Sequence, residues 1–391
     1  MPLHHYLKRN FLSPLLEFIH DSRAIGIIIL ICTTVSLLIS NSPLGTYFIS
    51  ALDTEIHITN WLPHSILHWI NDGLMTLFFF LAGMEIKREL IQGELSSIKK
   101  SMLPAMGALG GMLVPAGIFY LFNYNSNFSE GWGIPMATDI AFSLGVASLL
   151  GKKVPLALKI FLTALAIIDD LGAIIAIAIF YTNTLKLTLL FAALLLFSIM
   201  AVWTKLKKPF GWWNIILGLL LWVLVFNSGI HATIAGVLFA FTIPVNKLVS
   251  WENKLHNSVN FIIIPLFVLA NTAIVIPESF IHDMRSSLSL GIMAGLLIGK
   301  PVGIFLFCWI AIKLKWGVLS AEITGKHLVG LGILASIGFT MSIFISLLAF
   351  EQTDYQNTSK SAVMMASIIG IILSYLWFKW MIQIKAPNTL K

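Results

Sequence analysis

Two adjacent aspartates, Asp169 and Asp170, lie within the apolar stretch ALAIIDDLGAII at residues 164–175. An aspartate at the centre of a membrane-spanning helix costs about 2.5–3.5 kcal/mol on insertion scales, so such a residue is usually functional or paired. Neighbours on a helix point about 100° apart. We therefore expect one carboxylate to face a cavity together with Asp139, another acid at membrane depth, and the other to face a protein partner.

Carboxylates from two helices form a hard-oxygen site for a small cation, and the Thr138 hydroxyl beside Asp139 adds a further ligand. Like charges held close together raise the proton affinity of at least one of them. The same oxygens then hold either protons or a cation, but not both at once. This competition is the chemistry that exchange of a cation against protons requires.

Two structural explanations of the aspartate pair were weighed. A helix cap between two short helices would leave backbone groups unsatisfied in lipid, because the run 155–181 is about one bilayer long. A buried ion pair with Lys300, the basic residue in LIGKPVG, remains a possible explanation for one of the acids. One lysine does not account for the three acids Asp139, Asp169 and Asp170. Next to interrupted helices, Asp139 is expected to offset positive helix ends and Lys300 negative ones.

The elements that carry these residues are predicted to be membrane helices. Of 391 residues 58% are hydrophobic and 11% charged, with a mean hydropathy of +0.89, whereas soluble domains carry about 25% charged residues. We expect one all-α polytopic transmembrane domain over residues 1–391, without a soluble domain or a disulfide framework. Its twelve candidate spans lie near residues 24–40, 64–84, 101–122, 131–150, 155–181, 184–203, 210–226, 229–243, 258–276, 288–312, 327–350 and 359–382.

The net charge of +7 is distributed by the positive-inside rule rather than by a nucleic-acid surface. If the N-terminus is inside, nearly all loop lysines and arginines are cytoplasmic, and only Lys186, Arg285 and Lys360 are on the outer side. Residues 1–23 are then a cytoplasmic N-terminal segment, both termini are cytoplasmic, and no nucleic-acid partner is needed.

The loop at residues 45–61 alternates apolar and polar residues and predicts a small β-hairpin on the outer surface. A hairpin with exposed edges favours pairing with a partner, so this loop is a candidate dimer contact. An ordinary ordered loop is the alternative.

Two spans are interrupted near their centres, at 131–145 and at 331–345. They are the middle members of two three-span groups, spans 3–5 and 10–12. Paired interruptions in corresponding positions indicate inverted-topology repeats with the transport site where the breaks meet.

Weaker candidates lie away from the aspartates. Glu85, Glu89, Glu252 and His256 are expected at the cytoplasmic funnel, either as solvated charge or as a cluster whose titration gates access. His231 is placed at the start of a span on the outer side, where a histidine bonded at a helix end is the alternative.

Six ordered motifs resemble the NhaA family of bacterial sodium/proton antiporters from about Asp21 to Ile382: FFFLAGMEIKREL, ATDIAFSLG, AIIDDLGAIIAIAIFYT, NSGIHATIAG, GKPVGI and SIGFTMSIFI. The resemblance implies twelve transmembrane helices, the fourth and eleventh unwound and crossing, in a homodimer of the inner membrane. It implies an electrogenic, pH-regulated exchange of Na⁺, and also Li⁺, for protons by alternating access. Such a protein is not an enzyme and needs no cofactor.

The resemblance also assigns residues. Asp169 becomes the principal cation and proton carboxylate, which binds Na⁺ or protons together with Asp139. Asp170 becomes the second member of the pair, Thr138 an accessory ligand and Lys300 the basic residue near them. The positions tied to pH response are Glu85, Glu89, Glu252, His256 and His231. Asn253 departs from the family, which often has a second histidine there.

Three rival classes remain. An intramembrane aspartyl protease would have a Gly-x-Gly-Asp turn, but AII precedes Asp169. A sodium-coupled symporter for organic solutes would favour a larger cavity lined by amides, and the proton dependence of sodium flux separates it from an antiporter. A passive channel is disfavoured by helices broken at the midplane.

Overall fold

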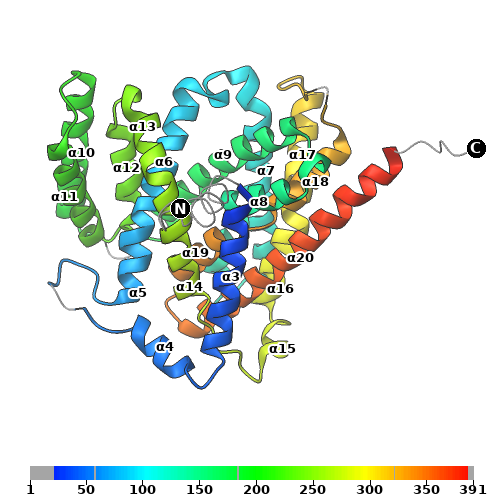
Figure 1. Ribbon diagram of the computed structural model, residues 1–391, viewed down its shortest axis with the longest axis horizontal. Helices are drawn as coiled ribbons and strands as arrows, with labels where there is room; N and C mark the ends of the chain where they lie inside the picture. The colour runs from blue at the N-terminus through cyan, green and yellow to red at the C-terminus, as the bar shows by residue number, and fades with distance from the viewer. Residues whose placement is uncertain (1–21, 57–58, 183–184, 321, 386–391) are drawn as a thin grey trace, which may run out of the picture.

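The computed structural model describes residues 22–56, 59–182, 185–320 and 322–385, and within them the chain is helical, with one isolated β-bridge between Glu55 and Ser65. The N-terminal segment expected at 1–23 lies almost wholly outside these residues. The helices pack side by side in one bundle (Figure 1). They are α3 (Ser22–Ser40), α4 (Gly45–Leu52), α5 (Ile66–His68), η2 (Trp69–Leu74), α6 (Met75–Gln92), η3 (Glu94–Ser96), α7 (Ile98–Asn123), η4 (Ser129–Met136), α8 (Ile140–Leu149), η5 (Gly151–Lys153), α9 (Leu156–Phe180), α10 (Leu187–Lys205), α11 (Trp212–Ser228), α12 (Thr233–Thr242), α13 (Val245–Ser258), η6 (Val259–Ile263), α14 (Ile264–Asn271), α15 (Phe280–Asp283), α16 (Ser287–Ala294), η7 (Gly295–Gly299), α17 (Lys300–Lys313), α18 (Gly325–Ala335), α19 (Phe339–Ala349) and α20 (Thr353–Lys385).

Helices occupy all twelve ranges in which spans were expected. Within the described residues, seven helices are long and apolar enough to cross a membrane, and the number rises to nine if each of two bent pairs is one span. The helices α11 and α12 are apolar but shorter. The all-helical, multi-pass architecture is therefore confirmed, while the number of twelve crossings remains a prediction.

The segment predicted as a hairpin differs from the expectation. Residues Gly45–Leu52 form the helix α4, which bends by 115° from α3. Among the described residues of the segment, one isolated β-bridge joins Glu55 to Ser65. The prediction of a hairpin over 45–61 is wrong for its first half, because Phe48 and Leu52 are also spaced four apart and fit one helical face. At the bend Gly45 is required, since a Cβ there would lie 2.2 Å from the Ser40 carbonyl oxygen.

Both predicted interruptions are present. The first separates the 3₁₀-helix η4 from α8 by extended residues at Ala137–Asp139, and the second bends α18 against α19 by 51°. The interruptions contact each other: the Asp139 amide donates to the Ile337 carbonyl at 2.9 Å, and the Ser342 hydroxyl donates to the Ile134 carbonyl at 2.8 Å. Backbone groups freed by one break are thus satisfied by the other, which is how irregular backbone persists at membrane depth.

The helix that carries the aspartate pair is central. In α9, 67% of the most apolar window is buried within the protein, against 11% in α10, which packs beside α11 at one end of the bundle (Figure 1). Next to α9, the helices α7 and α17 pack closely, because Gly110 and Gly303 face each other's carbonyl oxygens with no room for a Cβ. This close packing holds Lys300, the first residue of α17, inside the bundle.

Candidate cation and proton site

Lys300 is completely buried and forms an ion pair with Asp169, whose exposed fraction is 1%. Its Nζ lies 2.5 Å from Asp169 Oδ2 and donates a second hydrogen bond of 2.5 Å to Thr138 Oγ1. Burying two charges is favourable only when they are paired and hydrogen-bonded. Asp169 therefore faces a protein partner, and that partner is Lys300.

Asp139 lies between the N-termini of two helices. Its Oδ1 accepts from the Phe142 amide in the first turn of α8 at 2.9 Å. Its Oδ2 accepts from the amide and the hydroxyl of Thr340, in the first turn of α19, at 3.0 and 2.5 Å. A carboxylate at this point is stabilised by both helix dipoles. The prediction that Asp139 offsets positive helix ends is confirmed.

In the described part of the chain, Lys300 is linked to the negative end of a helix through Thr138. The Thr138 hydroxyl accepts from Lys300 and donates to the Ala335 carbonyl, the last residue of α18, at 3.1 Å. The expectation that Lys300 itself offsets negative helix ends is thus replaced by a relay, because the ammonium group is nearer to a full negative charge on Asp169.

Asp170 belongs to a different environment. Together with Asp139 and Thr340 it lines a cavity of about 360 Å³ that Asp169 does not line. Asp170 is 4% exposed, and its buried Oδ1 has no hydrogen-bond partner among the described residues. The oxygens of these three residues come from the N-cap of α8, from α9 and from α19. They can accept a proton or a small cation, whereas Asp169 is already neutralised.

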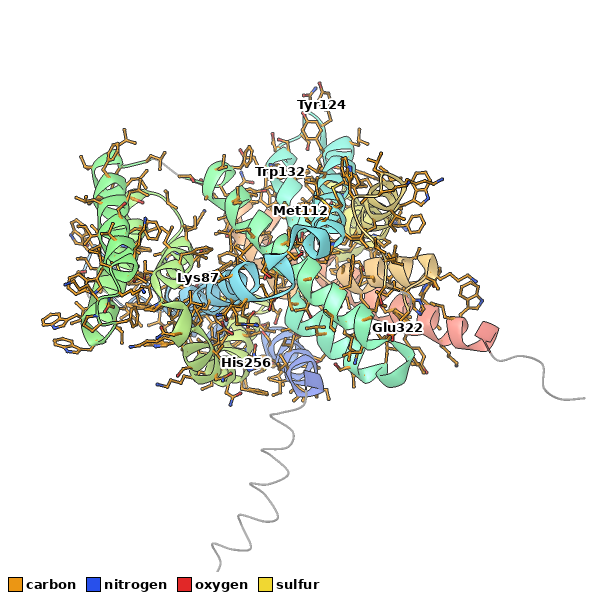
Figure 2. All side chains as sticks on the ribbon, turned by 90° about the horizontal axis from the view of Figure 1, so that it is seen from above. Lys87, Met112, Tyr124, Trp132, His256 and Glu322 are labelled. Atoms are coloured by element: carbon orange, nitrogen blue, oxygen red, sulfur yellow. The ribbon has the colours of Figure 1, made fainter. Side chains whose placement is uncertain are left out.

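Four of the five predicted pH-response residues lie around Arg88, which lines the same cavity. Its guanidinium bonds Glu89 Oε1 and Glu252 Oε2, both at 2.9 Å. Glu85 and His256, the latter labelled in Figure 2, line the cavity with Arg88. The arrangement brings four of the five predicted residues, Glu85, Glu89, Glu252 and His256, to one region.

His231 lies elsewhere. Its Nε2 is bonded to the Tyr181 carbonyl oxygen, and the residue lines a second cavity together with Asn71, Asp72 and Gln356. This placement corresponds to the bonded helix-end histidine that was the alternative. The structure does not bring it together with the Arg88 cluster.

Two buried lysines were missed from the sequence. Lys87 (Figure 2) donates to the carbonyls of Phe241 and Ile243 at the C-terminal end of α12, at 2.7 and 2.5 Å. Lys360, which was assigned to the outer side, is 8% exposed within α20. The only sequence signal for Lys87 was its place in a helix whose preceding residues are apolar.

No cluster of three or more histidine, cysteine or acidic side chains that could hold a resident metal ion occurs in the described part of the chain. Asp139, Asp170 and the Thr340 hydroxyl form a smaller set of oxygen donors on the cavity, which also contains the carboxylate of Glu85.

Comparison with known proteins identifies the family. The family model described as "Na+/H+ antiporter 1" matches residues 16–378. The chain is 47% identical over 364 residues to "Na(+)/H(+) antiporter NhaA 2" of Flavobacterium johnsoniae, covering 90% of this chain and 89% of the relative. It is 43% identical over 380 residues to "Na(+)/H(+) antiporter NhaA" of Cytophaga hutchinsonii, covering 96% and 97%.

A solved structure shares the fold. The sodium proton antiporter MjNhaP1 of Methanocaldococcus jannaschii at pH 8 is similar with a TM-score of 0.50 and 15% identity, over 94% of this chain and 97% of that one. The family match and the close relatives confirm the resemblance seen in the six motifs. The chain therefore belongs to the Na⁺/H⁺ antiporter 1 family of multi-pass membrane transporters.

Proposed function

We propose that this chain is an electrogenic antiporter that extrudes Na⁺, and also Li⁺, in exchange for a larger number of protons. The observation that carries the proposal is that Asp139 and Asp170 line one cavity at the contact between the two interrupted spans. In this proposal the protein is a secondary transporter and not an enzyme, because the proton gradient supplies the energy. It needs no cofactor.

Competition between cation and protons follows from the unpartnered oxygen of Asp170. A buried carboxylate oxygen without a hydrogen bond is costly. Either protonation of Asp170 or a cation shared with Asp139 removes that cost, and each excludes the other. Protons arriving from outside displace Na⁺, and exposure to an alkaline cytoplasm releases the protons.

Asp169 takes part through Lys300. The ammonium group occupies the position beside Asp169 Oδ2 that a cation ligand would need. The role implied for Asp169, to bind Na⁺ with Asp139, therefore requires that Lys300 withdraw from Oδ2 if the cation binds through both oxygens; Oδ1 has no hydrogen-bond partner among the described residues. We propose that a cation entering from the Asp170 side competes with Lys300 for Asp169, with Thr138 as an accessory ligand.

Alternating access is proposed to arise from inverted repeats in spans 3–5 and 10–12, whose interrupted helices cross at the site. The hydrogen bonds between the two interruptions support this arrangement. The proposal includes twelve transmembrane helices in a single domain, cytoplasmic termini and a bacterial inner-membrane location. It also includes a homodimer through the outer loop 45–61, and regulation by pH through the Arg88 cluster with His231.

The rival classes are disfavoured by particular observations. An aspartyl protease needs two carboxylates that share a water molecule, but Asp169 is held by Lys300. A symporter for organic solutes would not need carboxylates on the cavity from two helices. Its sodium flux would also be independent of protons.

Reconstituted vesicles test the function. The purified protein is sealed into vesicles with a lumenal pH dye, a pH gradient is imposed, and Na⁺, Li⁺ or K⁺ is added outside. We expect proton movement with Na⁺ and Li⁺ and none with K⁺. Because more protons than cations move in each cycle, the rate should rise with a membrane potential that drives positive charge in the direction of the proton movement. Absence of cation-driven proton movement at any alkaline pH would contradict the proposal.

A further inference from the structure

A buried asparagine, Asn260, belongs to the lining of the cavity. Asn260 lies in the π-helical turn η6, within the apolar run VNFIIIPLF, and is 8% exposed. A π-helical turn adds one residue to a helix and occurs frequently at functional sites. Asn260 lines the same cavity as Asp170 and Asp139.

Only one end of the Asn260 amide is bonded. Its Nδ2 lies 3.1 Å from Nε2 of His256, one helical turn earlier and exposed at the end of α13. With Nδ2 as donor, Nε2 is the acceptor and the imidazole proton is on Nδ1. Asn260 Oδ1 then has no hydrogen-bond partner among the residues that the structure describes. In this arrangement the nitrogen end of the amide is bonded to His256 and the oxygen end is free.

A second neutral oxygen lies along the same wall. Thr163 lines the cavity and is seven residues before Asp170, so the two share one face of α9. Its hydroxyl donates to the Lys159 carbonyl at 3.0 Å, which leaves the lone pairs of the oxygen available. Neutral oxygens from η6 and α9 therefore line the same cavity as the carboxylate of Asp170.

The charges near Asn260 favour a cation there. Of the elements packed against η6, α6 contributes Glu85, Lys87, Arg88 and Glu89, and α13 contributes Glu252, Lys247 and Lys254. Arg88 is compensated by Glu89 and Glu252, and Lys87 is committed to the end of α12. Glu85 and Asp170 line the cavity and attract a cation. The oxygen of a neutral amide can replace a water molecule in the cation's hydration shell, but it adds no negative charge that would bind the cation tightly.

We propose that Asn260 Oδ1 is a ligand that positions the incoming cation in the inner cavity, one step before Asp170, and that His256 is a positioning residue that keeps this oxygen free. The inference rests on the proposed function and deepens it, since it assigns the cytoplasmic approach to the site. The ligand class is a small monovalent cation, Na⁺ or Li⁺.

The test is the concentration dependence of Na⁺-driven proton movement in vesicles. Asn260→Leu removes the oxygen at similar size. We expect about a 5- to 10-fold rise in the apparent KM for Na⁺ with an unchanged maximal rate, because only binding before the midplane is weakened. The matched control is Asn257→Leu, an asparagine on the same cavity that makes no bond to His256 in the described structure, and its KM should match the wild type.

His256 variants give an independent answer should Asn260→Leu fail to fold, because His256 is exposed. His256→Leu removes the acceptor and should raise the apparent KM about 3-fold. His256→Gln offers a carbonyl oxygen to the same Nδ2 and should restore it. A structural role of His256 would lower the yield or the melting temperature instead of changing KM alone.

The outcomes separate this inference from the function on which it rests. Wild-type vesicles without Na⁺-driven proton movement overturn both. If the wild type exchanges and Asn260→Leu keeps the wild-type KM, or the two His256 variants behave alike, the inference fails and the proposed function stands.

Discussion

Asp169 and Asp170 are neighbours in sequence but lie in opposite surroundings. Asp169 is enclosed with the ammonium group of Lys300 at 2.5 Å from its Oδ2, whereas Asp170 lines a cavity and has no ion-pair partner among the described residues. In both residues Oδ1 is buried without a hydrogen-bond partner in the described part of the chain. The difference arises from the helix itself, which turns adjacent side chains about 100° apart. One residue step thus places a charge-paired carboxylate and a carboxylate without an ion-pair partner next to each other.

The largest expected effect is on exchange. Asp170→Asn and Asp169→Asn should each reduce Na⁺-driven proton movement at least about 100-fold, because the first removes the open ligand and the second removes the group that Lys300 must release. Dye-loaded vesicles measure the rate. Retained sodium-dependent proton movement in Asp169→Asn would contradict the role of Asp169 in binding the cation and protons. Retained movement in Asp170→Asn would exclude Asp170 from the site.

The same two variants should differ in stability. Asp169→Asn leaves Lys300 buried without its counter-charge and should lower the free energy of unfolding by about 3–5 kcal/mol. Asp170→Asn removes a buried carboxylate that has no partner charge and should not destabilise the protein. Melting curves in detergent measure the stability of both variants. An equal loss of stability in Asp169→Asn and Asp170→Asn would mean that the two residues have similar surroundings.

Lys300→Ala should lower the free energy of unfolding by the same amount, about 3–5 kcal/mol, because it leaves Asp169 buried without its counter-charge. The double variant Asp169→Asn/Lys300→Met removes both charges and should recover most of the stability while remaining inactive. Additive losses in the double variant would show that the pair is not coupled. Unchanged melting and transport in Lys300→Ala would exclude Lys300 from the site.

A smaller effect is expected at the cavity. Thr340→Val removes the hydroxyl that donates to Asp139 but keeps the backbone donor, and it should cost about 1.5–3 kcal/mol, the range for hydrogen bonds to charged groups. It should also change the apparent KM for Na⁺. Thr340→Ser, which keeps the hydroxyl, is the control, and a Thr340→Val protein equal to Thr340→Ser would contradict the account.

The smallest effect concerns a neutral contact between the interruptions. Ser342→Ala breaks the bond to the Ile134 carbonyl and should cost about 0.5–1.5 kcal/mol, with little change in exchange. Thermal unfolding and the vesicle rate check both parts. A loss of exchange comparable to that of Asp170→Asn would show that the contact between the breaks takes part in transport directly.

Much of the site could be predicted because its residues violate local rules of membrane helices. Acids and a lysine inside apolar runs, and glycine and proline before Asp139, identify the region without any tertiary information. The sequence does not say which aspartate meets Lys300, because that depends on the lateral packing of α17 against α7 and α9. It also did not reveal Asn260, since a single amide next to a histidine carries no period or motif.

The structure of the loop at residues 45–61, in contrast, could not be predicted from its sequence. Its short alternation fitted both a strand and a helix, and the bend after α3, tight at Gly45, is followed by the helix α4. Patterns of a few residues do not decide between periods of 2 and 3.6. Long apolar runs such as α9 do, which is why the spans were located far more securely than the loop.

The most direct test of the central claim is proton release on cation binding. Purified protein in weakly buffered detergent at alkaline pH is mixed with Na⁺, and a pH dye records released protons. The account predicts release by the wild type and none by Asp170→Asn, because the cation displaces protons from the cavity carboxylates. Undiminished release by Asp170→Asn would contradict the claim that Asp170 is the open ligand of the pair.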